Sequence, residues 1–257
     1  MNVYDERTPR FYLGVDLGQA KDWTAIVGIE VLQVSALLDR GNRQKQIDAE
    51  EADLRIVLAE RGQENYETVA DRVRDLVHSP QLATPWTLTE HWGELQVVDE
   101  GAVPPHVAVD ATGVGRAVVD MLSNRGIDFY PVQMTGGYET KKRKGFWNVP
   151  KKDLIAPGVV AFQNHWVKMA QGLPHREILE KELSNYRIKV NLSTGNESFE
   201  AWRERDHDDL VFALCLAIWC AMKTQTYGGW KRRTMVTGVY GYSRETGEVY
   251  SSLTPGV

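Results

Sequence analysis

Three acidic positions flank strongly apolar segments, and they are the residues of this chain best suited to chemistry. Asp16 and Asp110 each end a short apolar run, and the pair Asp208-Asp209 opens a run of 13 apolar residues. A single aspartate after a strand is usually a turn former or a helix cap. Several carboxylates at one sheet edge repel one another unless a divalent cation lies among them. The pattern therefore predicts a metal site.

Carboxylate oxygens are the ligands that Mg²⁺ and Mn²⁺ prefer. Two such ions about 4 Å apart can activate a water molecule and stabilise the leaving oxygen of a phosphodiester. His207 directly precedes the acidic pair. It is either a neighbour of the metal site, where it would orient a metal ligand, or only a neighbour of the residue that caps the helix.

Other chemistries find less support in the sequence. Gly113-Val-Gly115 follows an apolar run as in a dinucleotide-binding motif, but Val118 stands at the third glycine and Asp110 would repel the phosphates. A complete phosphate-binding loop of the GxxxxGK[ST] type is absent from the sequence. Cys215 and Cys220 lie within the apolar run and are best interpreted as small core residues.

Six basic residues gather between Tyr138 and Asp153, against two acids. They are Lys141, Lys142, Arg143, Lys144, Lys151 and Lys152. The net charge of −5 argues against a general nucleic-acid coat but allows a local basic patch. Alone, this cluster indicates a solvated loop; beside an acidic site it predicts contacts with DNA phosphates.

The elements that would position these residues follow from the apolar pattern. Strands are expected over Phe11–Val15, Thr24–Val34, Leu54–Ala59, Val107–Val109 and Phe129–Met134. Helices are expected over Asn65–His78, from Gly113-Val-Gly115 to Ser123, near Lys152–Ala161, near Glu177–Arg187 and over Asp209–Thr224. A hairpin is expected over Ile188–Ser198. This order indicates an α/β fold with a mixed sheet. If the first and fourth strands are neighbours, Asp16 and Asp110 lie side by side.

Several segments, taken in order, resemble the C-terminal nuclease domain of tailed-bacteriophage large terminase subunits. The matching segments are Tyr12-Leu-Gly-Val-Asp-Leu-Gly18, Asp22-Trp-Thr-Ala-Ile26, Val109-Asp-Ala-Thr-Gly-Val-Gly115, Thr135-Gly-Gly137, Val149-Pro-Lys-Lys-Asp-Leu154, Glu182-Leu183 and His207-Asp-Asp-Leu-Val211. The resemblance covers roughly Phe11 to Lys223.

This resemblance implies a ribonuclease H-like fold, with a central mixed five-stranded sheet flanked by helices and an added C-terminal hairpin. It also implies metal-dependent cutting of double-stranded DNA during viral genome packaging, with two Mg²⁺ or Mn²⁺ ions. The implied catalytic carboxylates are Asp16, Asp110 and Asp209. Asp16 would bridge both ions, Asp110 would bind one and Asp209 the other, with Asp208 as an alternate or additional ligand.

The predicted organisation is a leader over residues 1–10, the nuclease domain over 11–225 and a tail over 226–257. The family usually carries an ATPase motor before this domain, whereas here ten residues precede the first predicted strand. We therefore expect an excised or separately encoded nuclease half, or a free-standing relative. The expected partners are DNA, a packaging motor, the small terminase and the portal. Two cysteines, no basic apolar leader and no bilayer-length apolar run predict an intracellular protein, neither secreted nor in a membrane. The resemblance implies that its compartment is the cytoplasm of the infected bacterial host.

Three alternatives stay open at this stage. A junction-resolving nuclease on the same fold would prefer branched DNA, and a non-catalytic packaging module would cut nothing. An actin-like sugar kinase or chaperone ATPase also opens with Gly-Val-Asp-Leu-Gly, as at Gly14–Gly18, but needs a second phosphate loop of Asp-Gly-Gly type.

Overall fold

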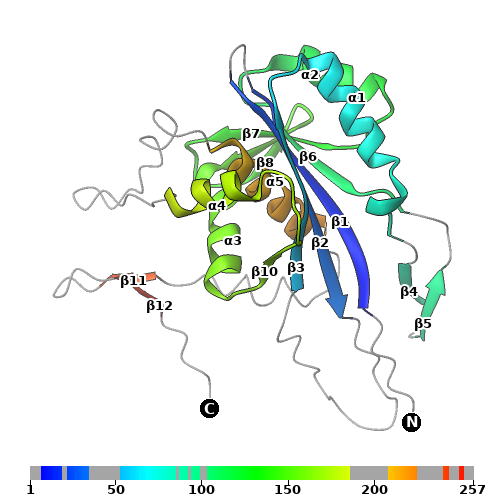
Figure 1. Cartoon of the computed structure of the whole chain (residues 1–257), viewed down its shortest axis with the longest axis vertical. Helices are drawn as coiled ribbons and strands as arrows, with labels where there is room; N and C mark the ends of the chain where they lie inside the picture. Colours follow the sequence, from blue (N-terminus) through cyan, green and yellow to red (C-terminus); the bar gives the residue numbers. More distant parts are fainter. Residues whose placement is uncertain are drawn as a thin grey trace, which may run out of the picture.

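A computed structural model describes residues 7–18, 22–34, 53–84, 87–91, 94–98, 103–185, 208–224, 240–242 and 249–251. Its main feature is an eight-stranded mixed sheet in the order β10-β3-β2-β1-β6-β7-β9-β8 (Figure 1). These strands are β1 (Arg7–Asp16), β2 (Thr24–Val34), β3 (Asp53–Gly62), β6 (His106–Asp110), β7 (Tyr130–Thr135), β8 (Lys141–Arg143), β9 (Phe146–Pro150) and β10 (Val167–Met169).

The five predicted strands form the centre of this sheet as β3-β2-β1-β6-β7. β1, β2 and β3 pair antiparallel, whereas β6 and β7 continue from β1 in parallel. The five predicted strands are therefore correct for the centre of the sheet, but the whole sheet has eight strands. β10 extends it beyond β3, and β9 with β8 extends it beyond β7.

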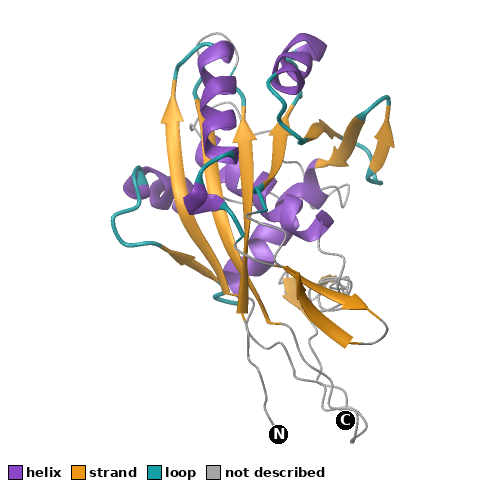
Figure 2. Ribbon diagram, turned by 90° about the vertical axis from the view of Figure 1, so that its right-hand side faces the viewer, coloured by secondary structure: helices purple, strands orange, loops and turns teal. Residues whose placement is uncertain are grey.

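Helices cover both faces of the sheet (Figures 1 and 2). The helices are α1 (Tyr66–Val77), the short 3₁₀ turn η1 (Pro80–Leu82), α2 (Gly115–Asn124), α3 (Lys151–Gln163), α4 (Arg176–Asn185) and α5 (Asp209–Thr224). α1 and α2 bury their apolar residues with one face of the central strands. α3, α4 and α5 pack with the other face, which we call the α5 face. The α/β architecture predicted from the sequence is thus confirmed.

α5 is the central helix of the core. Its residues from Leu210 to Ala221 are all buried, as its apolar composition on every side predicts. It crosses β1 at Gly14, where an added Cβ would lie 2.6 Å from the backbone nitrogen of Ala217 and still closer to the carbonyl oxygen of Ala213. Only a residue without a side chain allows this approach. Cys215 and Cys220 are free and buried in this helix, which confirms their interpretation as core residues.

Several boundaries differ from the sequence-based expectation. β1 begins at Arg7, inside the predicted leader, because it continues to pair with β2 as far as Val34. The proline-rich stretch between η1 and β6 contains a two-stranded hairpin of β4 (Thr87–His91) and β5 (Glu94–Val98). The basic cluster is a strand and turn rather than a loop, since Lys141–Arg143 pair with β9.

Two further predictions concern the C-terminal part. The hairpin expected over Ile188–Ser198 lies outside the described residues. Within the predicted tail, β11 (Tyr240–Tyr242) pairs with β12 (Val249–Ser251). Among the helices of the described segments, none has the length and apolar character needed to cross a membrane.

The contact at Gly14 generates a prediction about stability. Gly14→Ala forces a methyl group against the backbone of α5, so the helix must move away from β1. We expect the free energy of unfolding to fall by at least the roughly 1–3 kcal/mol typical of overpacked cores, measured by chemical denaturation. Gly136→Ala is the matched control, because its added Cβ meets no atom within 4 Å. Equal stabilities of the two variants would refute the close contact.

Candidate functional site

Asp16 and Asp110 end neighbouring strands. β1 and β6 run parallel with Val15 opposite Val109, so the next residue on each strand is one of the two aspartates. Strand spacing brings their Cα atoms to about 5 Å of each other. Asp16 is 8% exposed and Asp110 is 2% exposed. The predicted juxtaposition of these two carboxylates is therefore present, and both are largely removed from water.

Both carboxylates lie on the α5 face. Residues along a strand alternate between faces, so Asp16 shares a face with Tyr12 and Gly14. Tyr12 packs in the cluster that contains α5, whereas Val15 packs with α1 and α2. The same alternation on β6 places Asp110 with Ala108, which also belongs to the α5 cluster. The two acids thus share one edge and one face.

The turn after Asp110 is fixed by hydrogen bonds. The backbone N–H of Thr112 donates to Asp110 Oδ1 at 2.7 Å. The Thr112 hydroxyl oxygen in turn accepts from the backbone N–H of Met134 in β7, at 2.9 Å. Gly113 follows with φ +81°, a conformation that favours glycine. The Asp-Ala-Thr-Gly segment therefore orients the carboxylate and ties it to the next strand.

Cations lie at both ends of the row that contains the two acids. Pairing registers align a single row across seven strands. In order from β3 to β8, its members are Arg61, Ala25, Asp16, Asp110, Val132, Trp147 and Lys142, with β1 and β6 in the middle. The Lys142 ammonium lies 5.5 Å from the centroid of the Trp147 ring, and Lys223 of α5 lies 4.1 Å from the same centroid. The centre of the row is acidic and its ends are basic.

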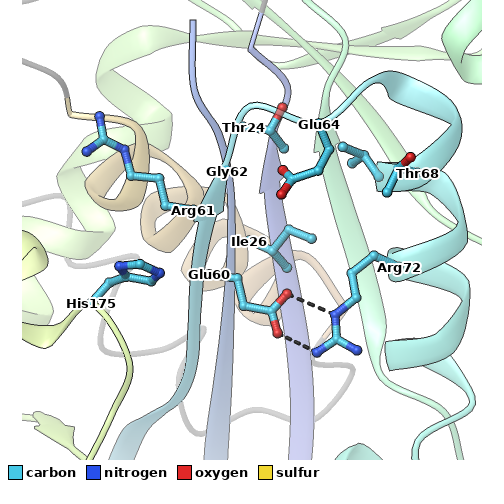
Figure 3. Close-up of a pocket in the computed structure, with 10 residues that line it drawn as sticks. Thr24, Ile26, Glu60, Arg61, Gly62, Glu64, Thr68, Arg72 and His175 are labelled. Carbon is cyan, nitrogen blue, oxygen red and sulfur yellow. Dashed lines mark hydrogen bonds and ion pairs between the residues drawn. The ribbon is translucent and has the colours of Figure 1, made fainter.

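The third predicted carboxylate reaches the basic end of this row. Arg61 Nη2 donates to Asp209 Oδ2 at 2.9 Å, and both side chains are largely buried. The guanidinium of Arg61 also stacks on Trp23, with its central carbon 4.5 Å from the ring centroid. Figure 3 shows Arg61 directed away from Glu60 and Arg72, which lie on the other side of β3. Asp209 is thus at the predicted edge, but it is engaged by a cation of the protein.

The structure does not bring all the predicted ligands into one cluster. Among the residues it describes, no group of three or more His, Cys, Asp or Glu side chains is arranged to hold a metal ion. Asp16 and Asp110 are paired by the sheet, whereas Asp208 and Asp209 stand at the start of α5. His207 lies outside the described residues.

The predicted DNA-binding residues surround the outer strands of the sheet. Lys141, Lys142 and Arg143 form β8, and Lys144 occupies the turn to β9. All four are exposed. Lys151 and Lys152 begin α3, where β9 ends, and the Lys152 ammonium lies 5.5 Å from the ring centroid of the exposed Tyr138. Because β7 and β9 run parallel to β6, this start of α3 is at the carboxylate edge.

Sequence reasoning missed the role of a fourth acid, Glu182 of α4. It is 6% exposed, and its Oε2 accepts the backbone N–H groups of Leu210 and Val211 at 3.0 and 3.1 Å. Burial raises the pKa of Glu182 to about 7, against the opposing effects of the Val211 N–H and the Arg61 charge. A signal was present: Glu182 lies three residues after the fully buried Leu179, on the apolar side of its helix.

A cavity of about 340 Å³ adjoins this site on the opposite face of β3 (Figure 3). It lies between β3 and α1, and Arg72 makes a two-pronged ion pair with Glu60 inside it. Neither Asp16 nor Asp110 lines it. The cavity and the carboxylate site share Arg61 but are separate features.

Comparisons with known proteins were made on sequence and on structure. No protein-family model and no curated protein matches the chain. Among solved structures, the large terminase nuclease from thermophilic phage G20c shares 20% sequence identity and a TM-score of 0.48, over 81% of each chain. The human cytomegalovirus terminase nuclease domain, soaked with Mn and bound to an inhibitor, shares 12% identity and a TM-score of 0.46, over 86% of each chain.

At these identities the similarity concerns the fold. The strand order β3-β2-β1-β6-β7, with two antiparallel and two parallel pairings, forms a mixed sheet of the kind that the sequence predicts. The chain has an α/β fold built on a mixed sheet, and it is similar in structure to these two terminase nuclease domains.

Proposed function

We propose that this protein is a divalent-metal-dependent endonuclease that cuts double-stranded DNA during viral genome packaging. The observation that carries the proposal is the buried pair of Asp16 and Asp110 at the ends of adjacent parallel strands. Two ionised carboxylates placed so close together, and with so little water, repel each other. A bound cation offsets both the repulsion and the loss of hydration.

The donor set fits a hard divalent ion. Asp16 and Asp110 offer oxygen ligands only, as Mg²⁺ and Mn²⁺ prefer. In the proposed site Asp16, Asp110 and Asp209 would hold two ions, with Asp208 as an alternate or additional ligand. When bound, two such ions would supply an activated water and stabilisation of the leaving oxygen of the scissile phosphodiester.

Asp209 must exchange partners for this to occur. Its carboxylate now faces Arg61, at the β3 end of the row that contains Asp16. Once Asp209 turns towards the ions, the Arg61 guanidinium is available to a phosphate oxygen of the DNA. Arg61 would then pair with Asp209 when no metal is bound, and with a DNA phosphate when metal is bound.

The basic residues at the other end of the row would hold the duplex. β8 and the start of α3 present Lys141, Lys142, Arg143, Lys144, Lys151 and Lys152. Cations of this kind position a duplex through its phosphates without reading sequence. The net charge of −5 implies modest intrinsic affinity for DNA, which suits a nuclease delivered by partners. We propose that these partners are a packaging ATPase motor, the small terminase and the portal, in the cytoplasm of an infected bacterium.

Plasmid cleavage tests the proposal directly. Supercoiled DNA incubated with the protein and Mn²⁺ should become linear or fragmented, whereas EDTA should prevent cutting because the carboxylates then hold no ion. Intact plasmid over a range of Mn²⁺ and Mg²⁺ concentrations would favour the non-catalytic assembly module. Cutting confined to four-way junctions would favour the junction-resolving alternative.

The first activity prediction concerns Asp16. Asp16→Asn keeps the size of the side chain but removes a charge that would hold the ions, so cleavage should fall by more than the roughly 10–100-fold typical of lost outer-shell partners of a metal site. The melting temperature without metal should stay constant or rise, because the repulsion with Asp110 is relieved. Asp120→Asn, an exposed change in α2, is the control. Wild-type cleavage by a folded Asp16→Asn variant would remove this residue from the site.

A second prediction separates the adjacent acids of α5. If Asp209 is the principal ligand, single-turnover cleavage by Asp209→Asn should be slower than cleavage by Asp208→Asn at saturating Mn²⁺. The melting temperatures of both variants show how much stability Asp209→Asn loses because its ion pair with Arg61 is broken. The reverse order of cleavage rates would shift the metal ligand to Asp208.

A third prediction concerns the basic strand. Replacement of Lys141, Lys142, Arg143 and Lys144 by alanine should weaken DNA binding in metal-free buffer. The log–log dependence of binding on salt should flatten by about 0.9 for each lost phosphate contact. Fluorescence anisotropy at several salt concentrations measures this slope, with the exposed Lys181→Ala of α4 as the control. An unchanged slope would contradict the placement of β8 on the DNA but would leave the metal site untouched.

A further inference from the structure

A carboxylate from another helix caps the first turn of α5. The backbone N–H groups at the start of a helix have no carbonyl partner within it. Here Leu210 and Val211 donate theirs to Oε2 of Glu182, at 3.0 and 3.1 Å. Glu182 lies in α4, 28 residues before Leu210. The cap therefore joins two helices, whereas an ordinary N-cap residue belongs to the helix that it caps.

This cap acts on the turn that carries the third acidic position. α5 begins at Asp209, and the carbonyl oxygen of Asp208 accepts the N–H of Phe212 at 2.9 Å, as in the first hydrogen bond of a helix. Leu210 and Val211 are the next two residues, so Glu182 holds the backbone directly after both aspartates. Arg61 holds the Asp209 side chain separately, at 2.9 Å. The backbone of this turn is thus anchored by Glu182 and the Asp209 side chain by Arg61.

The anchor at Glu182 comes with an energetic cost. Its Oε1 atom is buried without a hydrogen-bond partner among the described residues, although Oε2 accepts twice. A buried carboxylate with one unsatisfied oxygen is unfavourable. A Ser, Thr or Asn before the helix would satisfy the same N–H groups more cheaply. Such a cap, however, could not tie the start of α5 to α4.

We propose that Glu182 is a positioning residue of the metal site, which directs the start of α5 so that Asp208 and Asp209 can meet ions held by Asp16 and Asp110. The inference rests on the proposed nuclease function. Glu182 acts through the two backbone N–H groups, so an oxygen acceptor at the right distance is what the site requires. A side chain that keeps this acceptor should preserve the site, and one that removes or shortens it should not.

Four variants test the proposal. Glu182→Gln keeps an oxygen that can accept both N–H groups, and Glu182→Ala removes it. Glu182→Asp keeps the charge on a side chain that is one methylene shorter. Glu180→Gln is the matched control, because Glu180 is exposed on the same helix and pairs with Arg176. Single-turnover cleavage, calorimetric Mn²⁺ affinity and DNA affinity in metal-free buffer are measured for each.

We expect Glu182→Ala to lose at least 10-fold in cleavage rate and to bind Mn²⁺ several-fold more weakly, with DNA affinity unchanged within twofold. Glu182→Asp should show the same defects to a smaller degree. Glu182→Gln and Glu180→Gln should match the wild type within about threefold. If Glu182→Ala does not fold, the comparison of the Gln and Asp variants decides between the outcomes.

Three results would overturn the inference. Wild-type cleavage and Mn²⁺ affinity in Glu182→Ala or Glu182→Asp, even at a lower melting temperature, would make the residue a structural cap only. A Glu182→Gln variant as defective as Glu182→Ala would show that the charge itself is required, as in a metal ligand. A wild-type protein that neither cuts DNA nor binds Mn²⁺ would refute the proposed function first, and the positioning role with it.

Discussion

The close packing of α5 on β1 at Gly14 is the constraint on which the rest of the structure depends. The glycine lets the backbone of Ala213 and Ala217 touch the strand directly. One turn earlier in α5 stands Asp209, and two residues later on the same face of β1 stands Asp16. The contact that closes the apolar core therefore also fixes how far apart the acids at its edge can be. A larger residue at Gly14 would change the core and the site together.

A well-packed core is what allows the charges to be crowded. α5 buries twelve consecutive residues, and fully burying a large apolar side chain contributes about 1.5–3 kcal/mol. Against this background the sheet can hold Asp16 and Asp110 side by side and nearly out of water. Arg61 at one end of their row and Lys142 at the other place a positive charge at each end of it. In the proposed account, Arg61 neutralises Asp209 until metal and DNA replace it.

The sequence was informative where local pattern and burial coincide. The five central strands and α5 follow from apolar runs, and the adjacency of Asp16 and Asp110 follows once β1 and β6 are neighbours. β8 was missed because Lys-Lys-Arg has no alternation, and its extended shape comes from pairing with β9. The helical spacing from Leu179 could indicate that Glu182 is buried, but not what it binds, since its partners are backbone groups of Leu210 and Val211 far along the chain. The engagement of Asp209 by Arg61 is likewise a tertiary contact between residues 148 positions apart.

The central claim is that Asp16 and Asp110 are a pair of metal ligands, and anomalous X-ray scattering from crystals soaked in Mn²⁺ tests it most directly. We expect manganese peaks within coordination distance of both carboxylates, about 2.0–2.3 Å as for small divalent ions with oxygen ligands. We also expect Asp209 to have left Arg61 for the second ion. Crystals in which Asp16 and Asp110 stay free of manganese at concentrations that support cleavage would contradict the account.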